Sequence, residues 1–215
     1  MNATKNVFLF DFDGTLVDSM PYFINLMLKI LDENGVKYDD DIVKTITPLG
    51  YRGTAEYFKT LGIPESVDEI VAKMQEYAHD AYTNKIKAKE GVIEALNELK
   101  SRGASLNILT ASPHAALDPC LKRLGIFDIF NNVWSCDDFN TTKSDPMIYR
   151  LAAERIGENI ESIIFIDDNI NAIKTALQSG IKAFGIYDKS SHDSTEELKL
   201  IADGYLESMS EILLI

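Results

Sequence analysis

The sequence is poor in cysteine, lacks any long apolar run and has a deficit of positive charge. Only two cysteines occur in 215 residues, Cys120 and Cys136, without a CxxC spacing, which argues against a disulfide framework and predicts free thiols in a reducing compartment. No apolar stretch is long enough to cross a bilayer. Lys and Arg number 21 against 34 Asp and Glu, so the formal net charge is −13. Because such a surface repels phosphate backbones and anionic lipids, we expect no nucleic-acid or membrane partner.

The rest of the composition is that of a globular protein. Hydrophobic residues make up 46% and charged residues 26% of the chain, which is ordinary for a folded domain. The length suits one domain or slightly more. The first residues, Met1 to Val7, pass directly into an apolar run and have no signal-peptide architecture. We therefore expect a cytoplasmic protein, and a monomer because no motif demands a partner chain.

Short apolar runs alternate with helical patterns along most of the chain, which predicts an α/β fold with a mostly parallel sheet. Several of the runs are almost wholly apolar, as expected for strands that are covered on both faces. The candidate strands are Asn6 to Phe10, Ala104 to Leu109, Asn132 to Ser135, Ser162 to Ile166 and Lys182 to Ile186.

One long segment interrupts this alternation. Between Val17 and Ala88 the sequence offers helical periodicity and no confident strand, with apolar residues spaced from Phe23 to Leu31 and from Ile70 to Ala81. We therefore expect residues 17–88 to form a small helical domain, inserted into a core that consists of residues 1–16 and 89–215.

Local signals predict where several helices begin. Ser66 to Glu69 and Ser194 to Glu197 both fit a capping box. Asp145 followed by Pro146 predicts an N-cap with proline at the first helical position.

Polar side chains are found at or just beyond the ends of predicted strands. The first strand runs into Asp11-Phe12-Asp13-Gly14-Thr15-Leu16, in which two carboxylates can face one side of an extended chain. Thr110 follows the second strand, Lys143 precedes a helix, and Asp167-Asp168 follow another buried strand. Each of these alone has a common structural explanation, such as a turn, a helix cap or an exposed charge. The carboxyl ends of parallel strands share one edge of the sheet, where α/β proteins bind ligands, so we favour a common site.

In order and spacing, these residues resemble the four motifs of the haloacid dehalogenase superfamily of phosphohydrolases. Asp11 to Leu16 is similar to the first motif, Thr110 to the second, Lys143 to the third and Asp167-Asp168 to the fourth. The resemblance covers essentially the whole chain. An α-helical cap inserted after the first motif is typical of the branch that contains phosphoglycolate phosphatase and beta-phosphoglucomutase. The resemblance implies a Rossmann-like catalytic core with residues 17–88 as the cap.

The resemblance also implies roles in catalysis. Asp11 would be the nucleophile that accepts the phosphoryl group. Asp13 would protonate the leaving oxygen and then deprotonate the attacking water. Thr110, the adjacent Ala111, and Lys143 would hold the phosphoryl oxygens.

A Mg²⁺ ion is implied in the same way. Asp168 would bind it together with the Asp11 carboxylate and the Asp13 backbone carbonyl, and Asp167 would be a second acidic ligand or a partner just outside the metal's ligands. The charge count supports a metal, since four carboxylates carry −4 and Lys143 offsets one. Oxygen ligands suit Mg²⁺, and a dianionic phosphate needs the extra positive charge.

Two residues depart from the family pattern. Ser144 stands where the third motif usually has a proline, and we expect a modest effect on the rigidity of that loop. Asn171 stands where the fourth motif often has a further acid, which leaves open whether it ligates the metal.

The leaving group is the least determined property. Arg52, between Gly50 and Gly53 in the predicted cap, is the best candidate for a second anionic group, although an ordinary surface arginine is an equal alternative. Ser112 and His114 are weaker candidates for the pocket.

Three functions remain open on the sequence. The first is a Mg²⁺-dependent phosphatase that acts on a small phosphorylated metabolite, such as a sugar phosphate or phosphoglycolate. The second is a phosphomutase of the beta-phosphoglucomutase type, which would need a second phosphate-binding patch in the cap. The third is a phospho-acceptor signalling domain, which Asp13 disfavours because it supplies the acid and base that turnover needs.

Overall fold

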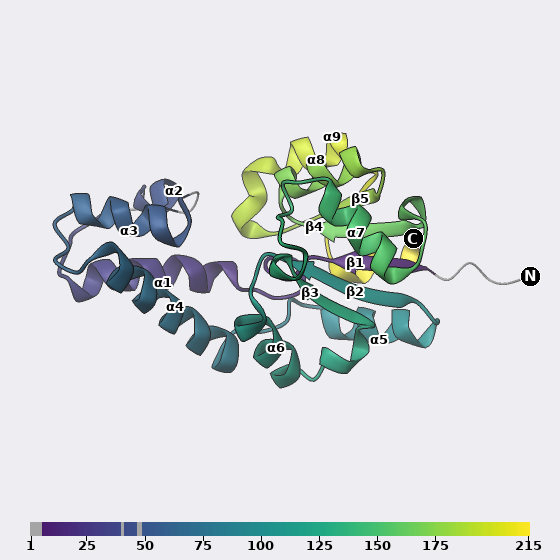
Figure 1. Ribbon diagram of the computed structural model, residues 1–215, viewed down its shortest axis with the longest axis horizontal. Coiled ribbons are helices and arrows are strands. Elements are labelled where there is room, and N and C mark those ends of the chain that lie inside the picture. Colours follow the sequence, from purple (N-terminus) through teal and green to yellow (C-terminus); the bar gives the residue numbers. More distant parts are fainter. Residues whose placement is uncertain (1–5, 40, 47–48) are drawn as a thin grey trace, which may run out of the picture. The chain divides into compact units, whose positions relative to one another are not determined.

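The computed structural model describes residues 6–39, 41–46 and 49–215 (Figure 1). The segment 1–5, for which the sequence predicts no signal peptide, lies outside the described residues. The chain divides into two compact units, one made of Met1–Asp18 with Lys87–Ile215 and the other of Ser19–Ile86.

A parallel sheet forms the centre of the first unit. Its order is β3-β2-β1-β4-β5-β6, and neighbouring strands are parallel throughout. All five predicted strands are confirmed, and their ends differ from the prediction by at most one residue. The sixth was not predicted because three residues are too short to show a strand pattern. The strands are β1 (Val7–Phe10), β2 (Ser105–Thr110), β3 (Asn132–Ser135), β4 (Ile163–Asp167), β5 (Lys182–Ile186) and β6 (Gly204–Leu206).

Helices cover both faces of this sheet (Figure 1). α5 and α6 lie on one face and α7, α8 and α9 on the other, as right-handed crossovers require when the strand order reverses at β1. The helices are α5 (Val92–Ser101), α6 (His114–Arg123), α7 (Met147–Ile156), α8 (Ile170–Ser179) and α9 (Thr195–Ile201). Short 3₁₀ segments lie at Phe127–Ile129, Cys136–Phe139, Ile160–Ser162, Lys189–Ser194 and Met209–Leu214.

The register aligns the carboxyl ends of the central strands. β1 is buried along its whole length, which fits the apolar sequence Val-Phe-Leu-Phe of a strand covered on both faces. Phe10 lies opposite Ile108 of β2 and Ile166 of β4. The residues that follow these three positions therefore lie side by side at one edge of the sheet.

The second unit is helical. α1 (Met20–Glu33) packs against α4 (Val67–Asn84), which also packs against α3 (Gly50–Thr60), and α2 (Ile42–Ile46) is a short helix beside α3. The capping box at α4 is confirmed, because the Ser66 hydroxyl accepts from the Glu69 amide while the Glu69 carboxylate accepts from the Ser66 amide.

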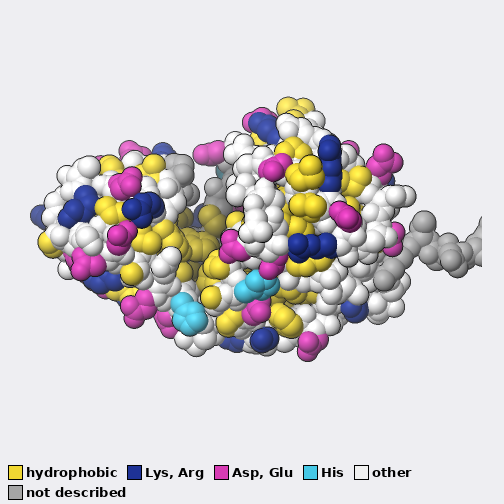
Figure 2. Space-filling model, viewed as in Figure 1, with side chains coloured by type: hydrophobic (Ala, Val, Ile, Leu, Met, Phe, Trp, Pro, Cys, Tyr) yellow, Lys and Arg dark blue, Asp and Glu magenta, His cyan; other side chains and the backbone are white. Residues whose placement is uncertain are grey.

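Other local predictions had mixed outcomes. The second capping box is wrong, because Ser194 has helical angles (φ −96°, ψ −2°) at the end of a 3₁₀ segment that runs into α9, and its side chain caps nothing. Cys120 and Cys136 are free and buried. No helix in the described part of the chain is long and apolar enough to cross a membrane. Acidic and basic side chains are interspersed on the face seen in Figure 2.

Candidate active site

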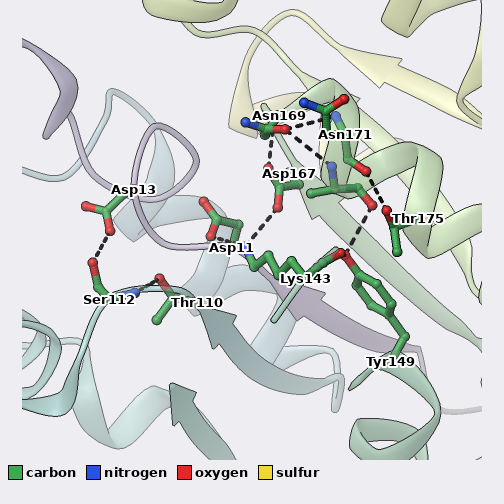
Figure 3. A network of polar contacts seen from close by, with 11 residues as sticks. Asp11, Asp13, Thr110, Ser112, Lys143, Tyr149, Asp167, Asn169, Asn171 and Thr175 are labelled. Atoms are coloured by element: carbon green, nitrogen blue, oxygen red, sulfur yellow. Dashed lines mark hydrogen bonds and ion pairs between the residues drawn. The ribbon is translucent and has the colours of Figure 1, made fainter. Parts of the chain in front are cut away.

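At the carboxyl edge of the sheet, Lys143 joins two other predicted site residues, Asp11 and Asp167 (Figure 3). Asp11 directly follows β1, and Asp167 is the last residue of β4. The Lys143 ammonium donates to Asp11 Oδ1 and, at 2.8 Å, to Asp167 Oδ2. The three side chains are only 8%, 2% and 13% exposed for Asp11, Asp167 and Lys143. A buried cation therefore bridges two buried carboxylates that come from neighbouring strands.

Burial and mutual repulsion perturb these groups. Burial raises the pKa of Asp11 to about 7, and the nearby Asp167 and Asp13 charges act in the same direction, while Lys143 opposes them. Burial by itself would lower the pKa of Lys143, but the two carboxylates outweigh it and hold that pKa above its usual value. Since one lysine faces two carboxylates, the site carries an excess of negative charge.

Asp168 increases this excess. Its side chain is buried, and burial together with the charges of Asp167 and Asp11 raises its pKa well above the usual value. Asp11, Asp167 and Asp168 each present a carboxylate oxygen, and these atoms lie within 4.8 Å of one another. Hard oxygen donors and unbalanced negative charge are what a cation such as Mg²⁺ requires, so this acidic group could hold a metal ion.

Asp13 lies beside the second strand end. Its Oδ2 accepts a hydrogen bond of 2.5 Å from the Ser112 hydroxyl, and the Ser112 amide donates to Thr110 Oγ1 at 3.1 Å (Figure 3). Thr110 is buried as the last residue of β2, and the adjacent Ala111 is exposed. Ser112, a weak candidate on the sequence, is therefore bonded directly to the predicted acid and base.

The first motif turns sharply at a glycine. Gly14 has φ +79°, and a Cβ atom there would lie 2.7 Å from Asp168 Oδ1. Only glycine combines this backbone conformation with the close approach. The turn therefore brings the loop after β1 against a predicted metal ligand on the loop after β4.

Lys143 is itself held by a buried tyrosine. The Tyr149 hydroxyl lies 3.1 Å from the Lys143 carbonyl and 3.1 Å from the Ala172 carbonyl. Ser144 stands where the family usually has a proline. Its backbone amide donates to Thr142 Oγ1 at 3.3 Å, a hydrogen bond that a proline could not make.

Arg52 lies in the second unit, in the first turn of α3. Its guanidinium is paired with Asp68 at 3.1 Å and with Glu56 at 3.8 Å, and the Arg52 side chain is 69% exposed. Its role as a phosphate contact stays a prediction.

His114 is tied into a separate network. It bridges Asp118 and Asp138 at 2.8 Å each. Asn171 is exposed in the first turn of α8, where its amide donates to Asn169 Oδ1 at 2.9 Å.

The sequence reading missed a second buried ion pair beside this site. The Lys89 ammonium binds Asp188 at 2.9 Å, and their side chains are 20% and 6% exposed. Lys89 follows the helical insertion, and Asp188 follows β5, but neither matches a motif. An acid just past the carboxyl end of a strand was the only available signal.

Comparison with known proteins agrees with this architecture. A family model described as "Haloacid dehalogenase-like hydrolase" matches residues 8–186. That range contains all eight predicted site residues and the whole second unit.

Two curated relatives and one solved structure illustrate the similarity. Pyrophosphatase PpaX of Bacillus velezensis is 31% identical over 83% of this chain and 81% of its own length. Phosphoglycolate phosphatase of Psychrobacter arcticus is 29% identical over 85% of this chain and 83% of its own. A crystal structure from Thermotoga maritima, provisionally named beta-phosphoglucomutase, superposes with a TM-score of 0.82 at 25% identity and covers 97% of both chains.

Proposed function

Because this chain belongs to the haloacid dehalogenase-like hydrolase family, we propose that it is a Mg²⁺-dependent phosphatase that hydrolyses a small phosphomonoester through an aspartyl-phosphate on Asp11. The observation that carries the proposal is the buried Asp11 side chain, bridged by Lys143 to Asp167 at the carboxyl edge of the sheet. A carboxylate is a competent phosphoryl acceptor, and a covalent intermediate divides hydrolysis into two easier steps.

In the first step, an Asp11 carboxylate oxygen attacks the phosphorus and the bond to the leaving oxygen breaks. Asp13 gives its proton to that oxygen, so the product leaves as an alcohol. Lys143 balances charge on the phosphoryl oxygens, and Thr110 and Ala111 contact those oxygens from the end of β2. Ser112 holds the Asp13 carboxyl group in place through its 2.5 Å hydrogen bond.

In the second step, water attacks the phosphorus of the aspartyl-phosphate. Asp13, now ionised, takes a proton from the water, and cleavage of the bond between phosphorus and the Asp11 oxygen releases phosphate. The Asp11 carboxylate and the Asp13 proton are thereby restored, so the cycle balances without another reactant.

A bound Mg²⁺ would offset the repulsion between the acidic site and a dianionic substrate. Its ligands would be Asp168, the Asp11 carboxylate and the Asp13 backbone carbonyl, with Asp167 as a further acidic ligand or a partner just outside them. The three clustered carboxylates and the raised pKa values of Asp11 and Asp168 support this assignment.

We assign residues 17–88 the role of a cap that selects the leaving group, with Arg52 as its candidate anion contact and residues 1–16 and 89–215 as the catalytic core of a monomer. The two curated relatives are named for pyrophosphate and for phosphoglycolate. Pyrophosphate therefore belongs in a substrate panel beside the small phosphomonoesters.

A mutase of the beta-phosphoglucomutase type is the second candidate, favoured by the name of the Thermotoga maritima structure. It would need a second phosphate site, and Arg52 would have to exchange its pairing with Asp68 and Glu56 for that phosphate. Hydrolysis needs no such exchange and is the function we favour.

The test is phosphate release from phosphoglycolate, hexose and pentose phosphates, pyrophosphate, and beta-glucose 1-phosphate with its bisphosphate activator. Each compound is assayed with Mg²⁺, with EDTA, and with the variant Asp11→Asn. The surface variant Asp193→Asn, an exposed carboxylate, is the matched control. We expect metal-dependent release that disappears only in Asp11→Asn. Isomerisation of glucose 1-phosphate without net release would favour the mutase, and release that survives Asp11→Asn would refute the mechanism.

A further inference from the structure

Lys89 uses all of its hydrogen-bonding capacity beside the first motif. Its ammonium donates to the Gly14 carbonyl at 2.5 Å, to the Tyr187 carbonyl at 2.6 Å and to Asp188 Oδ2 at 2.9 Å. A lysine ammonium has three donors, so none remains for another partner. This one side chain therefore connects the turn after β1 to the segment that follows β5.

The turn that Lys89 holds lies between two predicted site residues. Gly14 immediately follows Asp13, and its α-carbon faces the Asp168 carboxylate so closely that a Cβ would clash with it. The Lys89 backbone amide also donates to the Leu16 carbonyl at 3.0 Å. A displacement of Gly14 would therefore move Asp13, its neighbour in the chain, and also Asp168, whose carboxylate lies against the Gly14 α-carbon.

Backbone hydrogen bonds within the turn, from the Gly14 amide to the Val17 carbonyl and from the Leu16 amide to the Phe12 carbonyl, hold its shape, but the packing beside it is incomplete. A cavity of about 170 Å³ adjoins it, lined among others by Thr15, Lys89 and Tyr187. The buried Thr15 hydroxyl has no hydrogen-bond partner among the described residues. Because side chains do not fill this space, packing on this side of the turn is incomplete, and the Lys89 bonds add to what holds the turn in place.

Asp188 in turn holds Lys89. Its other oxygen, Oδ1, accepts from the Ser190 amide at 2.8 Å and from the Ser190 hydroxyl at 2.6 Å. These bonds and the Lys89 charge outweigh the effect of burial and keep the pKa of Asp188 below its usual value. The carboxylate is therefore an ionised, fixed anchor, unlike the mobile partner of a surface ion pair.

We propose that Lys89, anchored by Asp188, is a positioning residue that fixes Gly14 and thereby sets the placement of Asp13 and Asp168 in the active site. The kinetic part of this inference rests on the proposed phosphatase function. The placement of the turn itself does not, and it is measured separately.

The experiment compares wild type with Lys89→Met, Lys89→Arg and Asp188→Asn. Lys174→Met is the matched control, because it removes an ion pair of the same unit, with Glu197 at 2.6 Å, that does not contact the turn. Activity is measured with p-nitrophenyl phosphate and Mg²⁺. Amide hydrogen exchange is followed by NMR at three amides of the turn: the Gly14 amide, which donates to the Val17 carbonyl, and the Leu16 and Val17 amides, which both donate to the Phe12 carbonyl.

We expect Lys89→Met to lower kcat about 10- to 100-fold with little change in KM, since misplaced reacting groups slow the chemistry more than binding. Exchange at the three amides should rise about tenfold. Lys89→Arg should recover most of both losses, Asp188→Asn should lie between, and Lys174→Met should match wild type.

Unchanged kcat and unchanged exchange in folded Lys89→Met would overturn the inference. If that variant does not fold, Asp188→Asn decides the question, because wild-type exchange and wild-type kcat in Asp188→Asn would also overturn the inference. Failure of the proposed function looks different. Wild type and Asp11→Asn would then be equally inactive, while the exchange data would still report on the turn.

Discussion

Replacing Gly14 by alanine adds one methyl group at the point where the first motif touches Asp168. At φ +79° an L-residue is strained whatever the space around it. The added Cβ would also lie 2.7 Å from Asp168 Oδ1 and 2.9 Å from Asp168 Cγ. The substitution therefore combines backbone strain with a collision at a predicted metal ligand.

The two effects can be separated with a second glycine. Gly157, at the end of α7, has φ +81° and open space around its Cβ position. Gly157→Ala should cost only the strain, which is about 1–2 kcal/mol of unfolding free energy. In Gly14→Ala the clashing atoms must also separate by about 0.6 to 0.8 Å to reach an ordinary contact of about 3.5 Å. Asp168 is buried and has little room to yield.

The assay has two parts. Urea unfolding in EDTA gives the free energy of unfolding of each variant. Phosphate release from the best substrate, titrated with Mg²⁺, gives the activity. We expect Gly14→Ala to lose at least as much stability as Gly157→Ala and about 100-fold in kcat, since a displacement of this size at reacting groups is that costly. Gly157→Ala should stay within about twofold of wild type, because among the described residues no atom beyond its chain neighbours lies within 4 Å of its Cβ position.

Equal activity of the two variants at equal folded fraction would refute the reasoning. It would mean that Asp168 and the turn adapt to the methyl group without consequence for the reaction. A loss of stability in Gly14→Ala that is smaller than in Gly157→Ala would likewise contradict the contact.

Three further variants test other parts of the site. Lys143→Met should lower the free energy of unfolding in EDTA by about 3–5 kcal/mol at pH 8, because it leaves Asp11 without its buried partner. That loss should shrink toward pH 5 as Asp11, whose pKa is raised to about 7, takes up a proton, and a loss independent of pH would argue against it. His114→Asn tests a raised histidine pKa. Hydrogen bonds to Asp118, which has the larger effect, and to Asp138 raise the pKa of His114 above its usual 6.5. The contribution of His114 is complete below pH 6.5 and is lost as pH rises through the folded-state pKa, so urea unfolding should show a larger effect at about pH 5.5 than at about pH 9. Tyr149→Phe removes the hydroxyl that reaches two buried carbonyls and should cost about 1–3 kcal/mol, with weaker inhibition by inorganic phosphate; unchanged values of both would contradict a role in holding Lys143.

The grouping of the acidic residues was accessible from the sequence, because parallel strands that are buried on both faces have nearly continuous apolar sequences and share one carboxyl edge. Asp11 and Asp167 follow such strands, and the structure joins them through Lys143. The failure at Ser194 shows the limit of local signals. A capping box requires extended backbone at the cap, and the preceding 3₁₀ turn imposes helical angles there.

The sequence by itself determined the α/β class, five of the strands and the residues that meet at the sheet edge, since these follow from apolar periodicity and from short polar motifs. Tertiary structure alone decided the partners of those residues. Lys89 and Asp188 are 99 positions apart and neither belongs to a motif, so no local pattern could pair them. The Ser112 bond to Asp13 spans the same separation. Such pairs depend on strand order and register, which bring distant segments together only after the sheet has formed.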